Sequence, residues 1–298
     1  MSPAVRYERL PTEARNPRSR SLDRLSPGAL VRLMSAEDAR AVVAVRRQHA
    51  AIARATALIV RALRRGGRLI FAGAGTSGRL GVLEAAECPP TFHTPPSLVQ
   101  AIMAGGRGAV FRSREGAEDR RADARRAVAR RVRPGDVLVG IAASGVTPFV
   151  DEALRAAKRR GASTVLVTCH PKTPLRADVR IAPVVGPEVL SGSTRLKAGT
   201  ATKLVLNMLT LGAMVRLGKT YGHLMVDVRP TSRKLHARAL RLIQELTACS
   251  PPAAQRLLAQ SGGRVKVAVA MHRLGVSAPA ARRRLARAGG VLRRALAR

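Results

Sequence analysis

Five short apolar segments constrain the fold of this 298-residue chain more than any other feature of its sequence. They lie at residues 68–72, 98–103, 137–142, 163–168 and 180–185. None shows the apolar–polar alternation of a surface strand, and helical stretches separate most of them. Continuous apolar runs of this length are typical of parallel strands that are buried on both faces. Strands that alternate with helices build a doubly wound sheet. The sequence therefore predicts an α/β fold with a five-stranded parallel sheet.

The flanking segments suggest three regions. Residues 1–35 are rich in Pro and Arg and predict an extended arm. A helical pattern with Ser35 as a candidate N-cap follows and ends at two glycines after residue 65. We expect residues 36–250 to form the α/β domain with its flanking helices. Two consecutive prolines then mark the start of a small helical C-terminal subdomain at residues 251–298.

The charge balance is strongly basic, with 54 Lys and Arg against 18 Asp and Glu and a net charge of +36. Only seven of these 54 basic residues are Lys, which leaves 47 Arg. A bias of this kind, with abundant Ala and Gly, is typical of a GC-rich coding sequence. The basic residues are scattered, and at 2% the aromatic content offers no stacking surface for bases. Compositional drift is therefore favoured over a polyanionic partner, and we do not expect nucleic-acid binding.

Cysteine usage and hydropathy indicate a soluble cytoplasmic protein. Cys88, Cys169 and Cys249 are odd in number and lack the spacing of a disulfide framework, which favours a reducing compartment. Residues 1–12 contain no apolar core of a signal peptide. The apolar stretch at 204–215 is too short to cross a bilayer, so it predicts a buried helix rather than a membrane span.

A glycine-rich loop, residues 73–78 (GAGTSG), follows the first predicted strand and precedes a helix expected at residues 79–86. Backbone N–H groups at a helix start favour an anion, and glycines such as Gly75 and Gly78 let a ligand approach closely. The Thr76 and Ser77 hydroxyls add donors. No Gly-Lys-Ser/Thr follows, and no acidic residue ends the second strand, which excludes the two common nucleotide-binding motifs. A tight structural turn remains the alternative.

A second hydroxyl-bearing loop, residues 143–148 (ASGVTP), follows the third predicted strand in the same setting. It supplies Ser144, Gly145 and Thr147. Two such loops at one end of a parallel sheet would converge at a topological switch point. The pair predicts a site for a small phosphorylated molecule with several hydroxyls.

A third polar stretch, residues 192–200 (GSTRLKAGT), precedes the long apolar helix. Its hydroxyls and Lys197 suit an anion at a helix start. An ordinary N-cap with solvated basic residues explains the same pattern equally well.

Carboxylates, rather than histidines, are the candidate acid–base groups. Those near the predicted loops are Glu84, Glu87, Glu115, Glu118 and Asp119. Glu115, Glu118 and Asp119 lie at the start of a helix expected at residues 115–131, where capping is an equally good explanation. The six histidines lack metal-ligand spacing, so we expect no metal site.

Several of these segments together resemble one family, the N-acetylmuramic acid 6-phosphate etherases, which have the sugar isomerase (SIS) fold. The resemblance extends from about residue 8 to the C-terminus, and the glycine-rich loop runs on into ECPPTF at residues 87–92. The other matching stretches are residues 12–17 (TEARNP), 115–119 (EGAED), 143–145, 192–200, 207–208 and 224–227.

The resemblance implies cleavage of the D-lactyl ether of N-acetylmuramic acid 6-phosphate, without a metal or organic cofactor, by a homodimer. It implies that Glu87 protonates the departing lactate and that Glu118 is the partner acid–base group that activates water. The phosphate and sugar would then be held by Thr76, Ser77, Ser144 and Thr147, with Lys197 as a further candidate.

The chain departs from the family pattern at Glu84, where the family commonly has Asp, and at His170 and Ser232, where it has Asn. None of these changes removes a candidate catalytic group. Two rival functions remain. A non-catalytic sugar-phosphate regulator, of the glucokinase regulatory protein type, would not need both glutamates. A transcription regulator with an SIS domain usually carries an N-terminal helix-turn-helix, for which residues 1–35 are too short and too rich in Pro.

Overall fold

The computed structural model describes residue 8, residues 10–228 and residues 230–297. Residues 1–7, 9, 229 and 298, which fall in the expected arm, α/β domain and C-terminal subdomain, lie outside the described part. The chain forms two compact units, one of residues 1–86 and 97–210 and the other of residues 87–96 and 211–298. Helices α3 (Gly75–Phe92) and α7 (Lys197–Arg216) contribute residues to both units. The division into domains at residues 35 and 250 stays a prediction.

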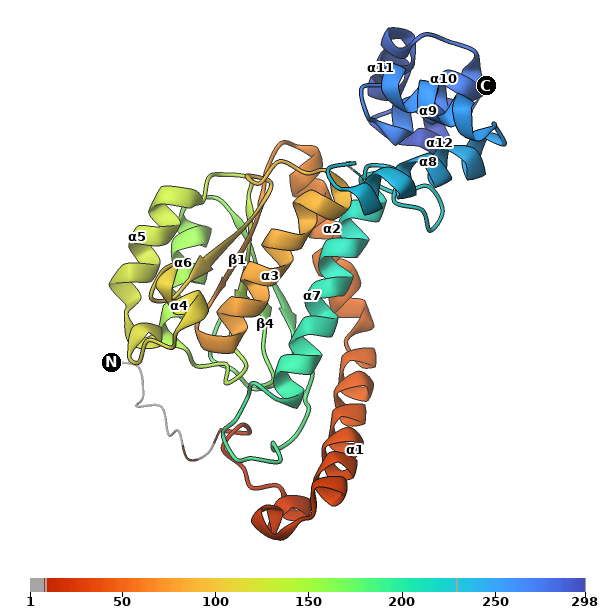
Figure 1. The fold of residues 1–298 in the computed structure, drawn as a ribbon. Coiled ribbons are helices and arrows are strands. Elements are labelled where there is room, and N and C mark those ends of the chain that lie inside the picture. Colours follow the sequence, from red (N-terminus) through yellow and green to blue (C-terminus); the bar gives the residue numbers. More distant parts are fainter. Residues whose placement is uncertain (1–7, 9, 229, 298) are drawn as a thin grey trace. The chain divides into compact units, whose positions relative to one another are not determined.

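The first unit contains the predicted five-stranded parallel sheet, with strand order β2-β1-β3-β4-β5 (Figure 1). Its strands are β1 (Leu69–Gly73), β2 (Val99–Met103), β3 (Val137–Ile141), β4 (Ser163–Val167) and β5 (Val179–Ile181). The fifth strand is shorter than expected because Pro183 lacks the N–H that a longer ladder needs. Strand β1 lies between β2 and β3, so the chain leaves the neighbouring strands β1 and β3 in opposite directions across the sheet.

Both faces of the sheet are covered, which explains why β1 and β3 are buried at every position. Helices α5 (Arg121–Arg131) and α6 (Pro148–Arg159) pack on the face that carries Ile70, Leu138 and Leu166. On the other face α3 packs so closely that a Cβ at Gly81 would lie 2.7 Å from the Phe71 Cβ. Helix α2 (His49–Arg64) contacts β3 and β5.

The expected helix from residue 36 to residue 65 is wrong in its start and in its continuity. Helix α1 (Pro27–Arg46) begins nine residues earlier, where the Ser26 hydroxyl accepts a hydrogen bond from the Ala29 N–H at 3.3 Å. Pro27 occupies the first helical position, which favours a proline. The Pro-rich composition of residues 1–35 therefore does not exclude a helix, as the prediction had assumed. The chain then breaks at Gln48, whose side chain accepts the Ala182 N–H at 3.1 Å after β5. Between residue 10 and α1 the arm carries the short 3₁₀ turns η2 (Pro17–Ser19) and η3 (Leu22–Arg24).

The second unit is helical and has its own core. Its helices, besides the ends of α3 and α7, are α8 (Arg233–Thr247), α9 (Pro251–Gln260), α10 (Val265–Leu274), α11 (Ala278–Arg287) and α12 (Leu292–Leu296). Ile243, Leu258 and Val269 are among its buried residues. The Lys266 ammonium donates to the carbonyls of Gly218 and Gly290, at 3.0 and 2.8 Å, and so ties α10 to two turns.

Helix α7 has the length and apolar composition that a membrane span would need. Half of its apolar window is buried inside the protein, as is common for a core helix.

Candidate active site

The glycine-rich loop is the first turn of α3, which begins at Gly75, four residues before the expected start. Gly75 adopts φ = 52°, and an added Cβ at Gly78 would lie 2.5 Å from the Gly73 carbonyl oxygen. The glycines therefore allow the helix to begin directly against the end of β1. Thr76 and Ser77 are half-buried, and within the described residues their hydroxyls have no hydrogen-bond partner. Both hydroxyls and the first N–H groups of α3 can thus bind a ligand.

The second loop leaves β3 at the same level, since Ile141 pairs with Gly73. Gly145 has φ = 71°, and a Cβ there would lie 2.8 Å from the His170 Cβ, so only glycine fits this turn. The Ser144 and Thr147 hydroxyls lie 3.5 Å apart. Thr147 precedes the first residue of α6 and makes no side-chain cap, so its hydroxyl also remains available to a ligand.

The two loops meet at a cavity of about 390 Å³ in the first unit, a size that suits a small metabolite. Its walls are formed by Leu10, Thr12, Glu13, Ala74, Gly75, Thr76, Ser77, Glu118, Asp119, Ile141, Ala143, Ser144, Val146, Thr147, Pro148, Gly192 and Thr194. This cavity lies at the carboxyl ends of β1 and β3, the switch point at which the sequence predicted a ligand site.

Glu118 is brought to the cavity by a short 3₁₀ turn, η4 (Ala117–Asp119), and the helix expected at residues 115–131 begins only at Arg121. Partial burial and the negative charges of Asp119 and Glu115 raise the pKa of Glu118, although the residue keeps substantial contact with solvent. Arg79 on α3 holds the segment that leads to Glu118, because its guanidinium donates to the carbonyls of Ala109 and Val110 at 2.9 and 2.8 Å. Because its pKa is raised, Glu118 is better suited to proton transfer at neutral pH than an ordinary glutamate is.

Glu87 is exposed on α3 and belongs to the second unit, whereas every residue that lines the cavity belongs to the first. Helix α3 continues through Pro89 and Pro90 to Phe92, beyond its expected end at residue 86. The structure thus brings Glu118 and the hydroxyl loops together, while the pairing of Glu118 with Glu87 stays a prediction.

Lys197 does not line the cavity. Its side chain is 1% exposed and forms an ion pair with Glu37. The N–H groups of Lys197 and Ala198 at the start of α7 donate to the buried Glu188 carboxylate, at 3.3 and 2.9 Å. An acidic side chain of the protein itself therefore occupies the helix start where residues 192–200 suggested a ligand anion. The alternative explanation placed Lys197 in solvent, whereas its side chain is buried.

The N-terminal arm supplies a part of the cavity wall that the sequence did not predict. Leu10, Thr12 and Glu13 line the cavity together with Gly192 and Thr194. Residues 12–17 stood out only through the family resemblance, and no local pattern indicated that they reach the sheet. The Gly192 N–H donates to the Thr12 carbonyl at 3.2 Å, a contact across 180 residues that no local spacing encodes.

The structure shows the local environment of each of the three residues that depart from the family pattern. Ser232 caps α8 by accepting the Leu235 N–H at 3.2 Å, a role that Asn can fill equally well. Glu84 is buried and bonds Lys203 and the Thr210 hydroxyl, joining α3 to α7. Burial lowers the pKa of His170, whose ring Nδ1 has no partner within the described residues. Across the described chain, no group of three or more His, Cys, Asp or Glu side chains could hold a metal ion.

The sheet order and the cavity at its switch point fit an SIS domain, and other doubly wound proteins share the same strand order. Family models agree: the SIS domain matches residues 119–212, and the glucokinase regulatory protein N-terminal SIS domain matches residues 51–158. A phosphoheptose isomerase from Francisella tularensis has a similar fold, with a TM-score of 0.50 and 18% identity. The match covers 65% of this chain and 98% of that one.

The particular family follows from closer relatives. The N-acetylmuramic acid 6-phosphate etherase of Gloeothece citriformis is 53% identical over 288 residues, which cover 96% of this chain and 94% of that protein. The etherase of Symbiobacterium thermophilum is also 53% identical, over 91% of each chain. The chain therefore belongs to the N-acetylmuramic acid 6-phosphate etherase family, which confirms the resemblance inferred from its motifs.

Proposed function

We propose that the chain cleaves the D-lactyl ether of N-acetylmuramic acid 6-phosphate, giving N-acetylglucosamine 6-phosphate and D-lactate in peptidoglycan sugar recycling. The observation that carries this proposal is the 53% identity to a named etherase over 96% of the chain. The cavity supports it, because two hydroxyl loops and a carboxylate of raised pKa lie around one space of metabolite size.

The reaction needs a base, an acid and an anion site. In the open-chain sugar the aldehyde makes the C2 proton acidic. A base removes that proton, the bond between C3 and the ether oxygen breaks, and the departing oxygen takes up a proton as lactate. Water then adds its hydroxyl to C3 and a proton to C2. None of these reaction steps requires a metal or an organic cofactor.

Glu118 is our candidate for the acid–base group that activates water. It must be ionised to accept a proton, and its raised pKa makes the carboxylate a stronger base. Glu87 is our candidate for the acid that protonates lactate. It belongs to the second compact unit, so its role rests on the family resemblance alone.

The hydroxyls of Thr76, Ser77, Ser144 and Thr147, with the first backbone N–H groups of α3, would bind the phosphate and the adjoining sugar hydroxyls. Gly75, Gly78 and Gly145 would allow the close approach. Lys197 is left out of this set, because its ammonium is 1% exposed and paired with Glu37. We also propose that the chain forms a homodimer. A cytoplasmic location is consistent with its three free cysteines. We expect neither a membrane nor a nucleic acid as a partner.

The regulator of the glucokinase regulatory protein type is the alternative function. The family model for that protein's N-terminal SIS domain matches residues 51–158. A shared sugar-phosphate fold is enough to explain such a match. A regulator would bind sugar phosphate without turnover.

Release of D-lactate from N-acetylmuramic acid 6-phosphate separates the two functions. Glu118→Gln and Glu87→Gln are each expected to lower turnover by roughly 10²–10⁴-fold, as for general acid–base groups. Glu245→Gln is the matched control, since Glu245 is exposed on α8 and outside the cavity. Sugar-phosphate binding without any lactate would favour the regulator, and near-normal activity of either glutamate variant would remove that residue from the mechanism.

A further inference from the structure

Residues 10–13 of the N-terminal arm contribute to the wall of the cavity and are held in place by several contacts. Leu10 and Thr12 are buried, and the Glu13 N–H donates to the Leu10 carbonyl at 2.9 Å, closing a turn. Thr12 also donates its hydroxyl to the Glu13 Oε1 at 3.3 Å. These contacts fix the Glu13 carboxylate, which lines the cavity while remaining exposed.

Gly192 makes room for this carboxylate. It adopts φ = 76°, and a Cβ at this position would lie 3.1 Å from the Glu13 Oε2. A side chain there would press on the carboxylate as well as strain the backbone. The glycine thus lets Glu13 lie directly against the loop that precedes α7.

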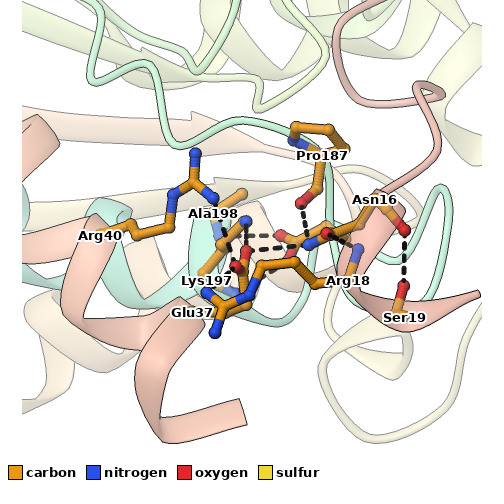
Figure 2. A network of polar contacts seen from close by, with 9 residues as sticks. Asn16, Arg18, Ser19, Glu37, Arg40, Pro187, Lys197 and Ala198 are labelled. Carbon is orange, nitrogen blue, oxygen red and sulfur yellow. Dashed lines mark hydrogen bonds and ion pairs between the residues drawn. The ribbon is translucent and has the colours of Figure 1, made fainter. Parts of the chain in front are cut away.

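Asn16 holds the arm in this position (Figure 2). Its side-chain amide donates to the Glu37 Oε2 at 2.9 Å and to the Pro187 carbonyl at 3.2 Å. Its Oδ1 accepts the Arg18 N–H at 3.0 Å, which caps η2. A single buried side chain therefore links the arm, α1 and the loop before α7.

Glu37 is the centre of this network, and Lys197 is its buried partner (Figure 2). The two side chains are 2% and 1% exposed. Burial alone would raise the pKa of Glu37, but the hydrogen bond and charge of Lys197, with Arg40 and Asn16, outweigh burial and lower it. An ionised Glu37 thus remains available to anchor the arm throughout the neutral pH range.

We propose that Glu13 is a substrate-contacting residue that accepts a hydrogen bond from a hydroxyl of the sugar, and that Asn16, Glu37 and Lys197 are positioning residues for it. This inference rests on the proposed function in taking a sugar phosphate as the ligand. A carboxylate repels the phosphate and attracts neutral hydroxyl donors. The phosphate would therefore lie at the hydroxyl loops, and the polyol chain would extend toward Glu13.

The test compares two ligands in equilibrium calorimetry, N-acetylglucosamine 6-phosphate and inorganic phosphate. Glu13→Ala is expected to weaken sugar-phosphate binding by about 10–100-fold, the range for a lost hydrogen bond to a charged group. Binding of inorganic phosphate should be unchanged or tighter, because a repelling charge is removed. Glu8→Ala, an exposed acidic position of the same arm outside the cavity, should change neither affinity.

Asn16→Leu tests the positioning role. It should weaken sugar-phosphate binding to a similar extent and speed trypsin cleavage of the arm, while Glu13→Ala leaves the cleavage rate unchanged. In lactate release, Glu13→Ala should raise KM with kcat changed by less than about threefold, as for a contact made equally in the ground and transition states.

An unchanged sugar-phosphate affinity in Glu13→Ala would overturn the inference, as would an equal loss of both ligands or no binding of N-acetylglucosamine 6-phosphate to the unsubstituted chain. Lactate release by the unsubstituted chain tests the proposed function separately. Failure of the proposed function can therefore be distinguished from failure of the inference about Glu13.

Discussion

Replacing Glu37 by Leu would leave the Lys197 ammonium, which is 1% exposed, without its acceptor. Among the described residues, Glu37 accepts the hydrogen bond of that ammonium. The reverse change, Lys197→Met, leaves Glu37 with Asn16 and with two half-exposed arginines, Arg18 at 3.0 Å and Arg40 at 3.3 Å. The two single substitutions should therefore differ, with Glu37→Leu the more damaging.

Breaking a buried ion pair by removal of one partner lowers the free energy of unfolding by about 3–5 kcal/mol. We expect Glu37→Leu to fall in that range and Lys197→Met to lose about 1–3 kcal/mol, because Glu37 keeps other donors. The double variant, Glu37→Leu with Lys197→Met, should lose less than Glu37→Leu alone, since no uncompensated charge remains.

Urea unfolding followed by far-UV circular dichroism measures these losses, and suits a chain without Trp. The lowered pKa of Glu37 also sets the pH dependence. Its contribution to stability is fully present above the ordinary value of 4.5 and is lost as pH falls through the lower pKa of the folded state. The gap between the unsubstituted chain and Glu37→Leu should thus stay constant from neutral pH to about pH 5 and narrow below that. Additive losses in the double variant, or a loss under about 1 kcal/mol in Glu37→Leu, would refute the buried-pair argument.

Two further predictions concern the cavity. Asp119→Asn removes a negative charge that raises the pKa of Glu118, so the acid limb of kcat/KM should move to lower pH; a pH–rate profile that stays in place or moves upward would contradict this. Gly145→Ala should destabilise the protein by about 2–6 kcal/mol, since left-handed strain adds to a 2.8 Å contact with the His170 Cβ. Gly75→Ala, with open space around the added Cβ, should lose only about 1–2 kcal/mol. Thermal unfolding compares the two, and equal losses would exclude the steric part.

The sheet and the two hydroxyl loops could be predicted from the sequence because their signals are local. Buried parallel strands require continuous apolar runs, and a helix that starts against a strand requires glycine, as at Gly78. The meeting of the two loops then followed from the rule for switch points.

The wall formed by the arm could not be predicted in this way. Asn16 bonds Pro187 across 171 residues, and Lys197 pairs with Glu37 across 160. Such contacts arise from packing of distant segments and leave no spacing pattern. Lys197 illustrates the consequence: beside hydroxyls in sequence it suggested an anion ligand, yet its charge is neutralised within the fold by Glu37.

Lactate formed in H₂¹⁸O from N-acetylmuramic acid 6-phosphate tests the central claim most directly. Elimination breaks the bond between the sugar C3 and the ether oxygen, so that oxygen stays with the lactate. Mass spectrometry should therefore detect D-lactate without ¹⁸O in its hydroxyl group, while water supplies the new hydroxyl at C3 of the sugar. D-lactate with ¹⁸O in its hydroxyl group, or no lactate at all from folded protein, would contradict the account.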